Sequence, residues 1–174
     1  MTIKITELDG QTMVRHVAAL STILADSVAG GASISFMAPM SYDDAAQYWL
    51  RDVRPDVVAE RRVLLGAEHD GELVGTVQLV TAMPPNQPHR CEIAKMIVHP
   101  EARRLGIGRA LMRHALERAR DLGKTLVTLD TRTGDVAELL YRSVRFDVAG
   151  VIPDFAWDPD GKARHSTTYM FRRL

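Results

Sequence analysis

The segment between residues 90 and 131 constrains the fold more than any other part of the chain. Residues 90–98 are predicted to form a strand closed by Pro100, residues 106–122 an amphipathic helix, and residues 126–131 a second strand. In a unit of this order the two strands run parallel and the crossover is right-handed. The chain is therefore predicted to contain a mixed sheet covered by helices.

Further strands are expected on either side of this unit. The dipeptide Asp70-Gly71 is a strong hairpin signal and joins two extended runs, which are predicted to pair antiparallel. The other segments show the alternating polarity or the flanking turn residues that are typical of short strands. The expected strands outside the central unit are residues 2–7, 62–68, 72–79, 146–152 and 166–172.

Helices account for most of the remaining chain. Apolar residues recur at helical spacing over residues 13–28. Ser41 and Asp44 have the spacing of a capping box, so a second helix is expected to begin there and to end before Pro55. A short helix is predicted at residues 136–143.

Length and charge narrow the class of protein. The 174 residues are enough for one domain with a substantial core, so residues 1–174 are expected to form a single α/β domain. Basic and acidic residues number 22 each, a balance that disfavours binding to nucleic acid or to an anionic membrane. The six histidines show no metal-ligand spacing, so no metal is expected. Without an apolar leader-like segment, the cytoplasm is the expected location.

The glycine turn between the central strand and helix is the most informative site. Arg103, Gly106 and Gly108 precede a helix N-terminus, where free backbone N–H groups and the helix dipole favour a phosphate. A dinucleotide-binding fingerprint would need a third glycine where Leu111 stands, and a P-loop would need a lysine where Arg109 stands. The residues present match neither of these two motifs.

The Arg-x-x-Gly-x-Gly turn resembles the pyrophosphate loop of the GNAT superfamily of acetyl-CoA-dependent N-acetyltransferases. The flanking segments also resemble that family in order and spacing, including a tyrosine, Tyr141, in the helix at residues 136–143. The resemblance implies a GNAT-type fold: a mixed, mostly antiparallel sheet of six or seven strands, splayed between the fourth and fifth, with about four helices. It implies that acetyl-CoA binds to Met96, Ile97, Val98, Arg103, Arg104, Leu105, Gly106, Ile107, Gly108, Arg109, Glu138 and Tyr141.

Two carboxylates are candidates for the base that this chemistry requires. An alkyl amine has a pKa of about 10 and must lose a proton before it attacks a thioester. Glu92 begins the fourth strand and Asp130 ends the fifth, so both would flank the thioester. Alternatively, Glu92 pairs with Arg90 or Lys95 on the surface and Asp130 caps a turn.

Tyr141 is the candidate acid. The departing thiolate belongs to a thiol with a pKa of about 8.5 and needs a proton, which a nearby phenol could supply. The alternative is a core tyrosine among apolar neighbours. A backbone N–H of the fourth strand, from Ile97 or a neighbour, is expected to donate to the thioester oxygen. Cys91 is expected to be a buried structural residue rather than a nucleophile.

Several stretches outside the cofactor turn resemble the tabtoxin-resistance members of the superfamily, which acetylate a small β-lactam amino acid. The resemblance implies a small-molecule amine as acceptor and a role in antibiotic resistance. Phe36, Trp49 and Phe155 are candidates to line the acceptor pocket, although aromatic core residues are commoner. A peptide or protein N-acetyltransferase and a non-catalytic acyl-CoA sensor are the alternatives, and a homodimer is left open. The matching stretches are residues 30–33, 36–38, 129–131, 136–138 and 159–161.

Overall fold

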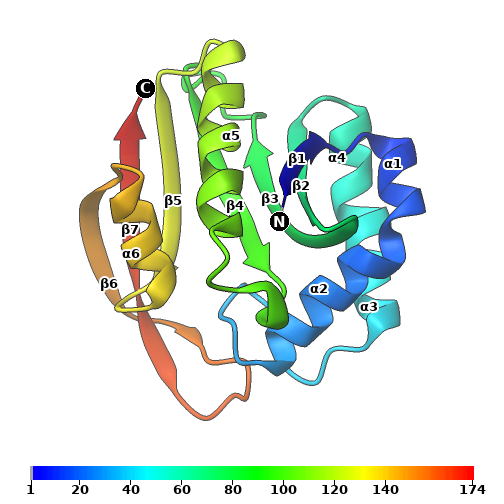
Figure 1. The fold of residues 1–174 in the computed structure, drawn as a ribbon. Coiled ribbons are helices and arrows are strands. Elements are labelled where there is room, and N and C mark those ends of the chain that lie inside the picture. Colours follow the sequence, from blue (N-terminus) through cyan, green and yellow to red (C-terminus); the bar gives the residue numbers. More distant parts are fainter. Residues whose placement is uncertain (1) are drawn as a thin grey trace.

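The computed structural model describes residues 2–174, in which seven strands form one mixed sheet. The strand order is β1-β2-β3-β4-β5-β7-β6, and all neighbouring pairs are antiparallel except β4 and β5. Figure 1 shows the sheet with β4 and β5 side by side near its middle. The strands are β1 (Ile3–Glu7), β2 (Arg62–His69), β3 (Glu72–Val80), β4 (Arg90–Val98), β5 (Leu126–Arg132), β6 (Asp147–Trp157) and β7 (Arg164–Arg173).

The pairing of β4 with β5 is short. The two parallel strands are in register at three positions only, Arg90 with Leu126, Cys91 with Val127 and Glu92 with Thr128. Beyond Glu92 the strands diverge, and the backbone edge of β4 that faces β5 has no strand partner in residues 2–174. The predicted mixed, mostly antiparallel sheet that splays between its fourth and fifth strands is confirmed.

Helices cover both faces of this sheet. Helix α5 packs on one face, where Ile107, Leu111 and Ala115 join a core with Val77 and Val127. The opposite face of β2 and β4 packs against the N-terminal helices through a second core. The helices are α1 (Gly10–Arg15), α2 (Val17–Ala29), α3 (Tyr42–Gln47), the π-helix η1 (Tyr48–Val53), α4 (Arg54–Val58), the 3-10 helix η2 (Pro100–Ala102), α5 (Ile107–Asp121) and α6 (Val136–Ser143).

The first predicted helix, residues 13–28, is broken in the structure. The Asp9 carboxylate accepts hydrogen bonds from the amides of Gln11 and Thr12, which starts α1 at Gly10. His16 then leaves helical geometry, with φ −100° and ψ 7°, and separates α1 from α2. Side-chain periodicity continues across this break, because one non-helical residue barely changes which face is apolar.

The second predicted helix begins as expected but does not end before Pro55. The capping box between Ser41 and Asp44 is present in both directions. Pro55 lies in the first turn of α4, where a residue without an N–H is tolerated because first-turn amides have no helical acceptor. The π-helix η1 connects α3 to α4, so the chain remains helical from Tyr42 to Val58. No helix among residues 2–174 combines the length and apolarity needed to cross a membrane.

Candidate active site

The turn before α5 has the geometry of an anion site. Gly106 has a φ of +83° and is the N-cap of α5, and no side chain caps the amides of the first turn. Arg104 also has a positive φ, 65°, so the turn is held in a left-handed conformation at two positions. Nε of Arg103 donates a hydrogen bond to the carbonyl of Val98 at 3.2 Å, which fixes the turn to the end of β4. The exposed amides and arginines are available to a phosphate.

The two glycines of this turn face different surroundings. A Cβ at Gly106 would meet no atom within 4 Å, so open space lies over its backbone. A Cβ at Gly108 would lie 3.0 Å from Leu140 Cδ2 and 3.6 Å from Met96 Sδ. Gly108 therefore allows the start of α5 to approach β4 and α6 closely. The space over Gly106 fits the close approach that a pyrophosphate needs.

A bulge in β4 reverses the face of the sheet to which the following side chains of the strand point. The register with β3 shifts between Thr76 and Gln78, and Lys95 on the opposite strand has a φ of 47°. Before the bulge, Ile93 belongs to the core beneath α5, whereas Ile97 after it belongs to the core with α2. The bulge directs Lys95 to the loop between α2 and α3, where its Nζ is 3.0 Å from Ser35 Oγ.

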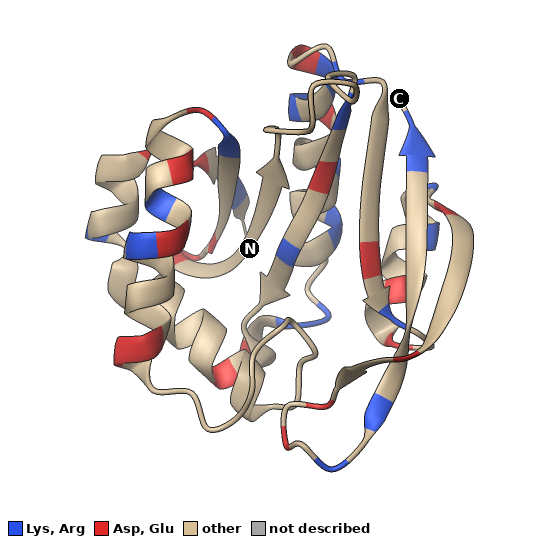
Figure 2. Cartoon of the chain, turned by 180° about the vertical axis from the view of Figure 1, so that it is seen from behind, with Lys and Arg blue, Asp and Glu red and all other residues tan. Residues whose placement is uncertain are grey.

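Glu92 and Asp130 lie on the same face of the sheet, opposite α5. Glu92 pairs with Thr128, and Asp130 is two residues further along β5, so the three side chains share a face. Figure 2 views this face, with acidic positions on both β4 and β5 beside the divergence of the strands. Arg90 Nη1 lies 3.2 Å from Glu92 Oε2 and donates to Thr128 Oγ1 at 2.7 Å. The alternative interpretation of Glu92, an ion pair with Arg90, is thus realised, while its carboxylate stays half-exposed.

Tyr141 lies on the other face of the sheet. Its side chain is buried in the core beneath α5 and packs 6.2 Å, centre to centre, from the Phe146 ring. Burial raises the pKa of the Tyr141 phenol well above its usual value, and the charges of Asp130 and Asp135 add to this effect. The phenol therefore keeps its proton over the physiological range, which is the state that a proton donor requires. It is also close enough to Asp130 for the charge of that carboxylate to affect its pKa.

The face of the sheet that carries Glu92 and Asp130 is the candidate acceptor face, and the sequence identified only some of the aromatic residues near it. Phe36 packs edge-on against Tyr48 with ring centres 4.9 Å apart, and Lys95 Nζ is 5.5 Å from the centre of the Phe36 ring. The interpretation of Trp49 as a pocket residue is wrong. Its side chain is 0% exposed, and its Nε1 donates to the Leu20 carbonyl at 2.9 Å, because Trp49 lies four residues after the buried Ala45 on the same face of the helix.

Phe155, on β6, remains a candidate to line the acceptor pocket. Its ring is 44% exposed and packs edge-on against Tyr169, with centres 6.0 Å apart. Tyr169 is directly opposite Asp130 on the neighbouring strand β7. Burial raises the pKa of Tyr169, and the charges of Asp130 and Glu92 contribute in the same direction. Sequence analysis did not single out Tyr169, because only the strand pairing brings it to Asp130.

Glu138 does not offer its carboxylate to a cofactor. One oxygen accepts from the Gly134 amide at 3.0 Å, and the other pairs with Arg142 Nη2 at 2.8 Å. These two contacts, the backbone hydrogen bond foremost, lower the pKa of Glu138. The expected cofactor contact through this carboxylate is not supported, since it instead holds the turn before α6. The short distance in sequence between Gly134 and Glu138 could have indicated this local role.

A hydrogen-bonded chain joins the two loops beside the acceptor face. Ser33 Oγ is 2.9 Å from His165 Nε2, and His165 Nδ1 is 3.0 Å from Asp158 Oδ1. Asp158 also pairs with Arg132 Nη1 at 2.9 Å. The amide of Ala38 adds a bond to the Pro159 carbonyl at 2.8 Å. The Ala38–Pro159 bond joins residues 36–38 to residues 159–161, and the Ser33–His165 bond ties residues 30–33 to the start of β7.

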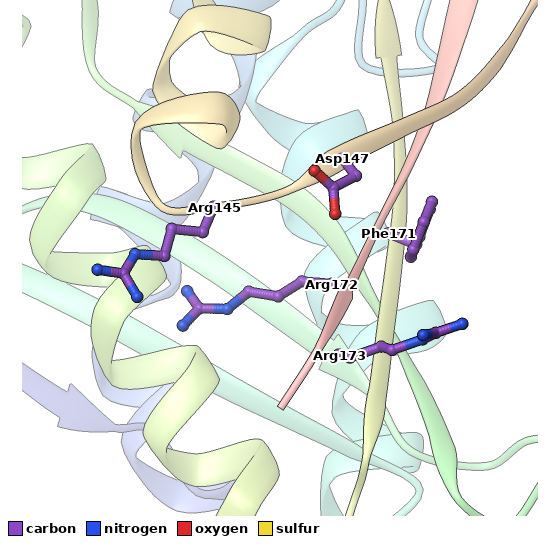
Figure 3. A pocket seen from close by; sticks show the side chains of 5 residues that line it. All are labelled: Arg145, Asp147, Phe171, Arg172 and Arg173. Carbon is purple, nitrogen blue, oxygen red and sulfur yellow. The ribbon is translucent and has the colours of Figure 1, made fainter.

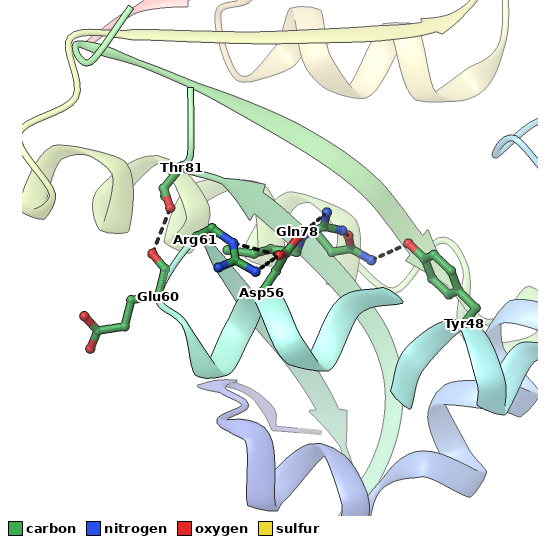
Figure 4. Close-up of polar contacts among 7 residues, drawn as sticks. Tyr48, Asp56, Glu60, Arg61, Gln78 and Thr81 are labelled. Atoms are coloured by element: carbon green, nitrogen blue, oxygen red, sulfur yellow. Dashed lines mark hydrogen bonds and ion pairs between the residues drawn. The ribbon is translucent and has the colours of Figure 1, made fainter. Parts of the chain in front are cut away.

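A second polar network holds Tyr48, the residue against which Phe36 packs. Figure 4 shows Asp56, Gln78 and Tyr48 in a row of contacts that runs from α4 across the sheet to η1. Arg62 bonds to Asp56 at 3.2 Å and to Gln78, and Gln78 Nε2 donates to the Tyr48 hydroxyl at 3.0 Å. Burial is the main cause that raises the pKa of Tyr48. The network fixes Tyr48, which in turn supports the Phe36 ring.

The cavity of about 340 Å³ shown in Figure 3 lies elsewhere. It is lined by the ends of β6 and β7, shares no residue with the glycine turn or the acceptor face, and is shallow. Within residues 2–174 no cluster of three or more potential metal ligands occurs. The residues lining the cavity are Arg145, Asp147, Phe171, Arg172 and Arg173.

Comparisons with known proteins agree on one family. The profile of the acetyltransferase (GNAT) family matches residues 30–144. The chain is 37% identical to human N-acetyltransferase 8 over 48% of this chain and 38% of that protein. It is 30% identical to an uncharacterized N-acetyltransferase in the hisH-hisA intergenic region of Azospirillum brasilense, over 62% of each chain. The alignments thus span less than two thirds of these relatives' lengths.

Solved structures share the whole fold. A ribosomal-protein-alanine N-acetyltransferase from Brucella melitensis superposes with a TM-score of 0.80 at 23% identity, over 98% of this chain and 99% of that one. The protein yncA of Salmonella typhimurium, determined with its cofactor acetyl-CoA, superposes with a TM-score of 0.79 at 20% identity. The latter match covers 100% of this chain and 95% of yncA. At these identities the likeness establishes the fold.

Proposed function

The chain belongs to the acetyltransferase (GNAT) family, and we propose that it is an acetyl-CoA-dependent N-acetyltransferase acting on the amine of a small polar molecule. The observation that carries the proposal is the divergence of β4 and β5 after Glu92. It leaves a backbone edge unpaired between an anion-binding turn and three candidate catalytic side chains. The fold neighbour yncA, determined with acetyl-CoA, supports the choice of cosubstrate.

The cosubstrate would bind along the turn and the open edge of β4. The amides at Gly106 to Arg109 and the side chains of Arg103 and Arg104 would hold the phosphates, where open space lies over Gly106. The backbone of residues 96–98 would hydrogen-bond the pantetheine arm. Acetyl-CoA, when bound, supplies the thioester that the amine attacks.

The chain's own residues would then move two protons. Glu92 and Asp130, on one face of the sheet, would position the acceptor's ammonium and take its proton directly or through a water. Tyr141, on the other face and protonated, would return a proton to the departing sulfur. A backbone N–H of β4, from Ile97 or a neighbour, would donate to the thioester oxygen as it gains charge.

The acceptor face favours a small molecule. Two loops tied together by the Ser33–His165–Asp158 contacts lie at one end of the sheet face that carries Glu92 and Asp130 (Figure 2). These loops hold three of the five stretches that resemble the tabtoxin-resistance acetyltransferase, so a β-lactam or amino-acid-like toxin is the specific candidate. Antibiotic resistance as a physiological role extends the same resemblance.

One set of measurements tests this proposal against its rivals. Isothermal titration with acetyl-CoA measures binding, and release of free thiol measures turnover on amino acids, dipeptides, amine antibiotics, polyamines and N-terminal peptides. We expect micromolar binding and turnover with small amines. Binding without turnover on any amine would favour an acyl-CoA sensor, and reaction with protein N-termini or lysines alone would favour a protein acetyltransferase.

A further inference from the structure

Lys95 is a half-buried lysine on β4 whose ammonium forms no ion pair with any residue in the described range 2–174. Its Nζ donates a hydrogen bond to Ser35 Oγ at 3.0 Å and lies 5.5 Å from the centre of the Phe36 ring. An ammonium has three N–H donors, and a hydroxyl uses one of them. The other donors are free to bind an anionic group of a ligand.

The surroundings of Lys95 make an added anion favourable. Burial lowers the pKa of Lys95, and the charge of Arg62 acts in the same direction, whereas the charges of Asp130 and Glu92 oppose the shift. Both carboxylates are thus close enough to interact with the ammonium but too far to pair with it. A desolvated positive charge without a partner is unfavourable, and a carboxylate beside it would offset much of that unfavourable energy.

Strained backbone and packed side chains fix the position of the Lys95 ammonium. Lys95 and its partner Ser35 both have a positive φ, 47° and 73°, a region that side-chain-bearing residues rarely adopt. Such strain persists only where the surrounding structure imposes it, and it is concentrated at ligand sites. Phe36, beneath the ammonium, is held by Tyr48, whose hydroxyl is bonded to Gln78. These contacts therefore hold the Lys95 ammonium in a fixed position at the acceptor face.

We propose that Lys95 binds the carboxylate of the acceptor, which makes the acceptor an amino acid or a close derivative with a free carboxylate. An amino acid carries an ammonium and a carboxylate a few ångströms apart. On this face Glu92 and Asp130 suit the ammonium, and Lys95 suits the carboxylate with a charge-assisted hydrogen bond. This inference rests on the proposed function and specifies its substrate class.

The test compares acceptors that differ only in the carboxylate. Purified full-length protein is assayed with acetyl-CoA on a panel of amino acids, their carboxamides and their decarboxylated amines. We expect the wild type to prefer the acids in kcat/KM by about tenfold to a hundredfold, the range for a hydrogen bond between charged groups. Lys95→Met should abolish this preference, by lowering kcat/KM for the acids far more than for the amides. Lys4→Met, at an exposed lysine on β1, is the matched control and should keep the preference.

A binding measurement separates recognition from chemistry. N-acetylated amino acids and their amides are titrated into the CoA-bound protein, and Lys95→Met should weaken binding of the acids alone by about tenfold to a hundredfold. Lys95→Gln is measured in parallel, with thermal unfolding, so that a folding defect in one variant is recognised. A wild type that does not discriminate acids from amides, or a preference that survives in both variants, overturns the inference. If the protein binds acetyl-CoA and acetylates only amines without a carboxylate, the inference fails and the proposed function stands. If it neither binds acetyl-CoA nor releases thiol, the proposed function itself fails.

Discussion

Replacement of Gly106 by alanine should separate the strain of the cofactor turn from its contact with phosphate. At a φ of +83° an alanine is in a left-handed conformation that costs about 1–2 kcal/mol. Since a Cβ there would meet no atom within 4 Å, no clash adds to this cost. For a domain of this size, 1 kcal/mol lowers Tm by about 2–4 °C, so a decrease of about 2–8 °C is expected.

The same substitution should weaken acetyl-CoA binding by a separate mechanism. The new methyl group would occupy the space through which a phosphate reaches the amides of the first turn of α5. Loss of one hydrogen bond to a charged group, about 1.5–3 kcal/mol, corresponds to a Kd about ten to a hundred times higher. Isothermal titration with acetyl-CoA at fixed salt measures this change.

Gly123 provides a matched control at the opposite end of the same helix. Its φ is +71° and its Cβ would also meet no atom within 4 Å, so Gly123→Ala should lower Tm to a similar extent. It should leave the Kd for acetyl-CoA unchanged, because it is distant from the turn. Gly106→Asn should recover part of the stability, since asparagine tolerates a positive φ, but not the affinity. Equal Kd values for Gly106→Ala and Gly123→Ala would refute the assignment of the phosphate site.

The remaining predictions concern the proposed chemistry. Tyr141→Phe should lower kcat by about 10²- to 10⁴-fold with little change in acetyl-CoA affinity. Because burial raises the pKa of the Tyr141 phenol, the wild-type kcat should show no loss of the acid between pH 7 and about pH 9; a fall with a midpoint in that range would contradict the role. The double variant Glu92→Gln/Asp130→Asn should lose more kcat/KM than either single variant, and full activity would exclude both as bases. His165→Ala should raise the acceptor KM without changing acetyl-CoA affinity; a changed cofactor Kd would count against the loop contact. Burial raises the pKa of the Cys91 thiol to about 11, so alkylation at pH 8 should be slow in the folded protein and Cys91→Ser should remain active.

The elements around the cofactor site could be predicted because their signals are local. Alternation and a closing proline identify β4, and the glycines identify the start of α5, since each property follows from neighbouring residues. The parallel pairing of β4 with β5 followed from the strand-helix-strand order, because parallel neighbours are joined by such a crossover. The divergence after Glu92 came from the family resemblance, and the structure confirms it.

The acceptor side could not be predicted because it depends on irregular backbone and on strand pairing. The alternation of apolar residues set by Cys91 and Ile93 breaks at Lys95, but this break does not by itself specify the bulge that directs the side chain to Ser35. Helical spacing from the buried Ala45 could have placed Trp49 in the core, whereas the contact of Tyr48 with Phe36 depends on the irregular loop before α3. Tyr169 reaches Asp130 only through the register of β7 on β5.

Asp130 is a proposed proton acceptor, and its charge also acts on Tyr141, the proposed proton donor. Its charge contributes to the raised pKa of Tyr141 on one face of the sheet and of Tyr169 on the other, and it opposes the lowered pKa of Lys95. A carboxylate that takes a proton loses this charge, which removes one of the influences that hold the proton on Tyr141. Proton uptake at Asp130 would therefore make Tyr141 a stronger acid at the moment the sulfur requires a proton.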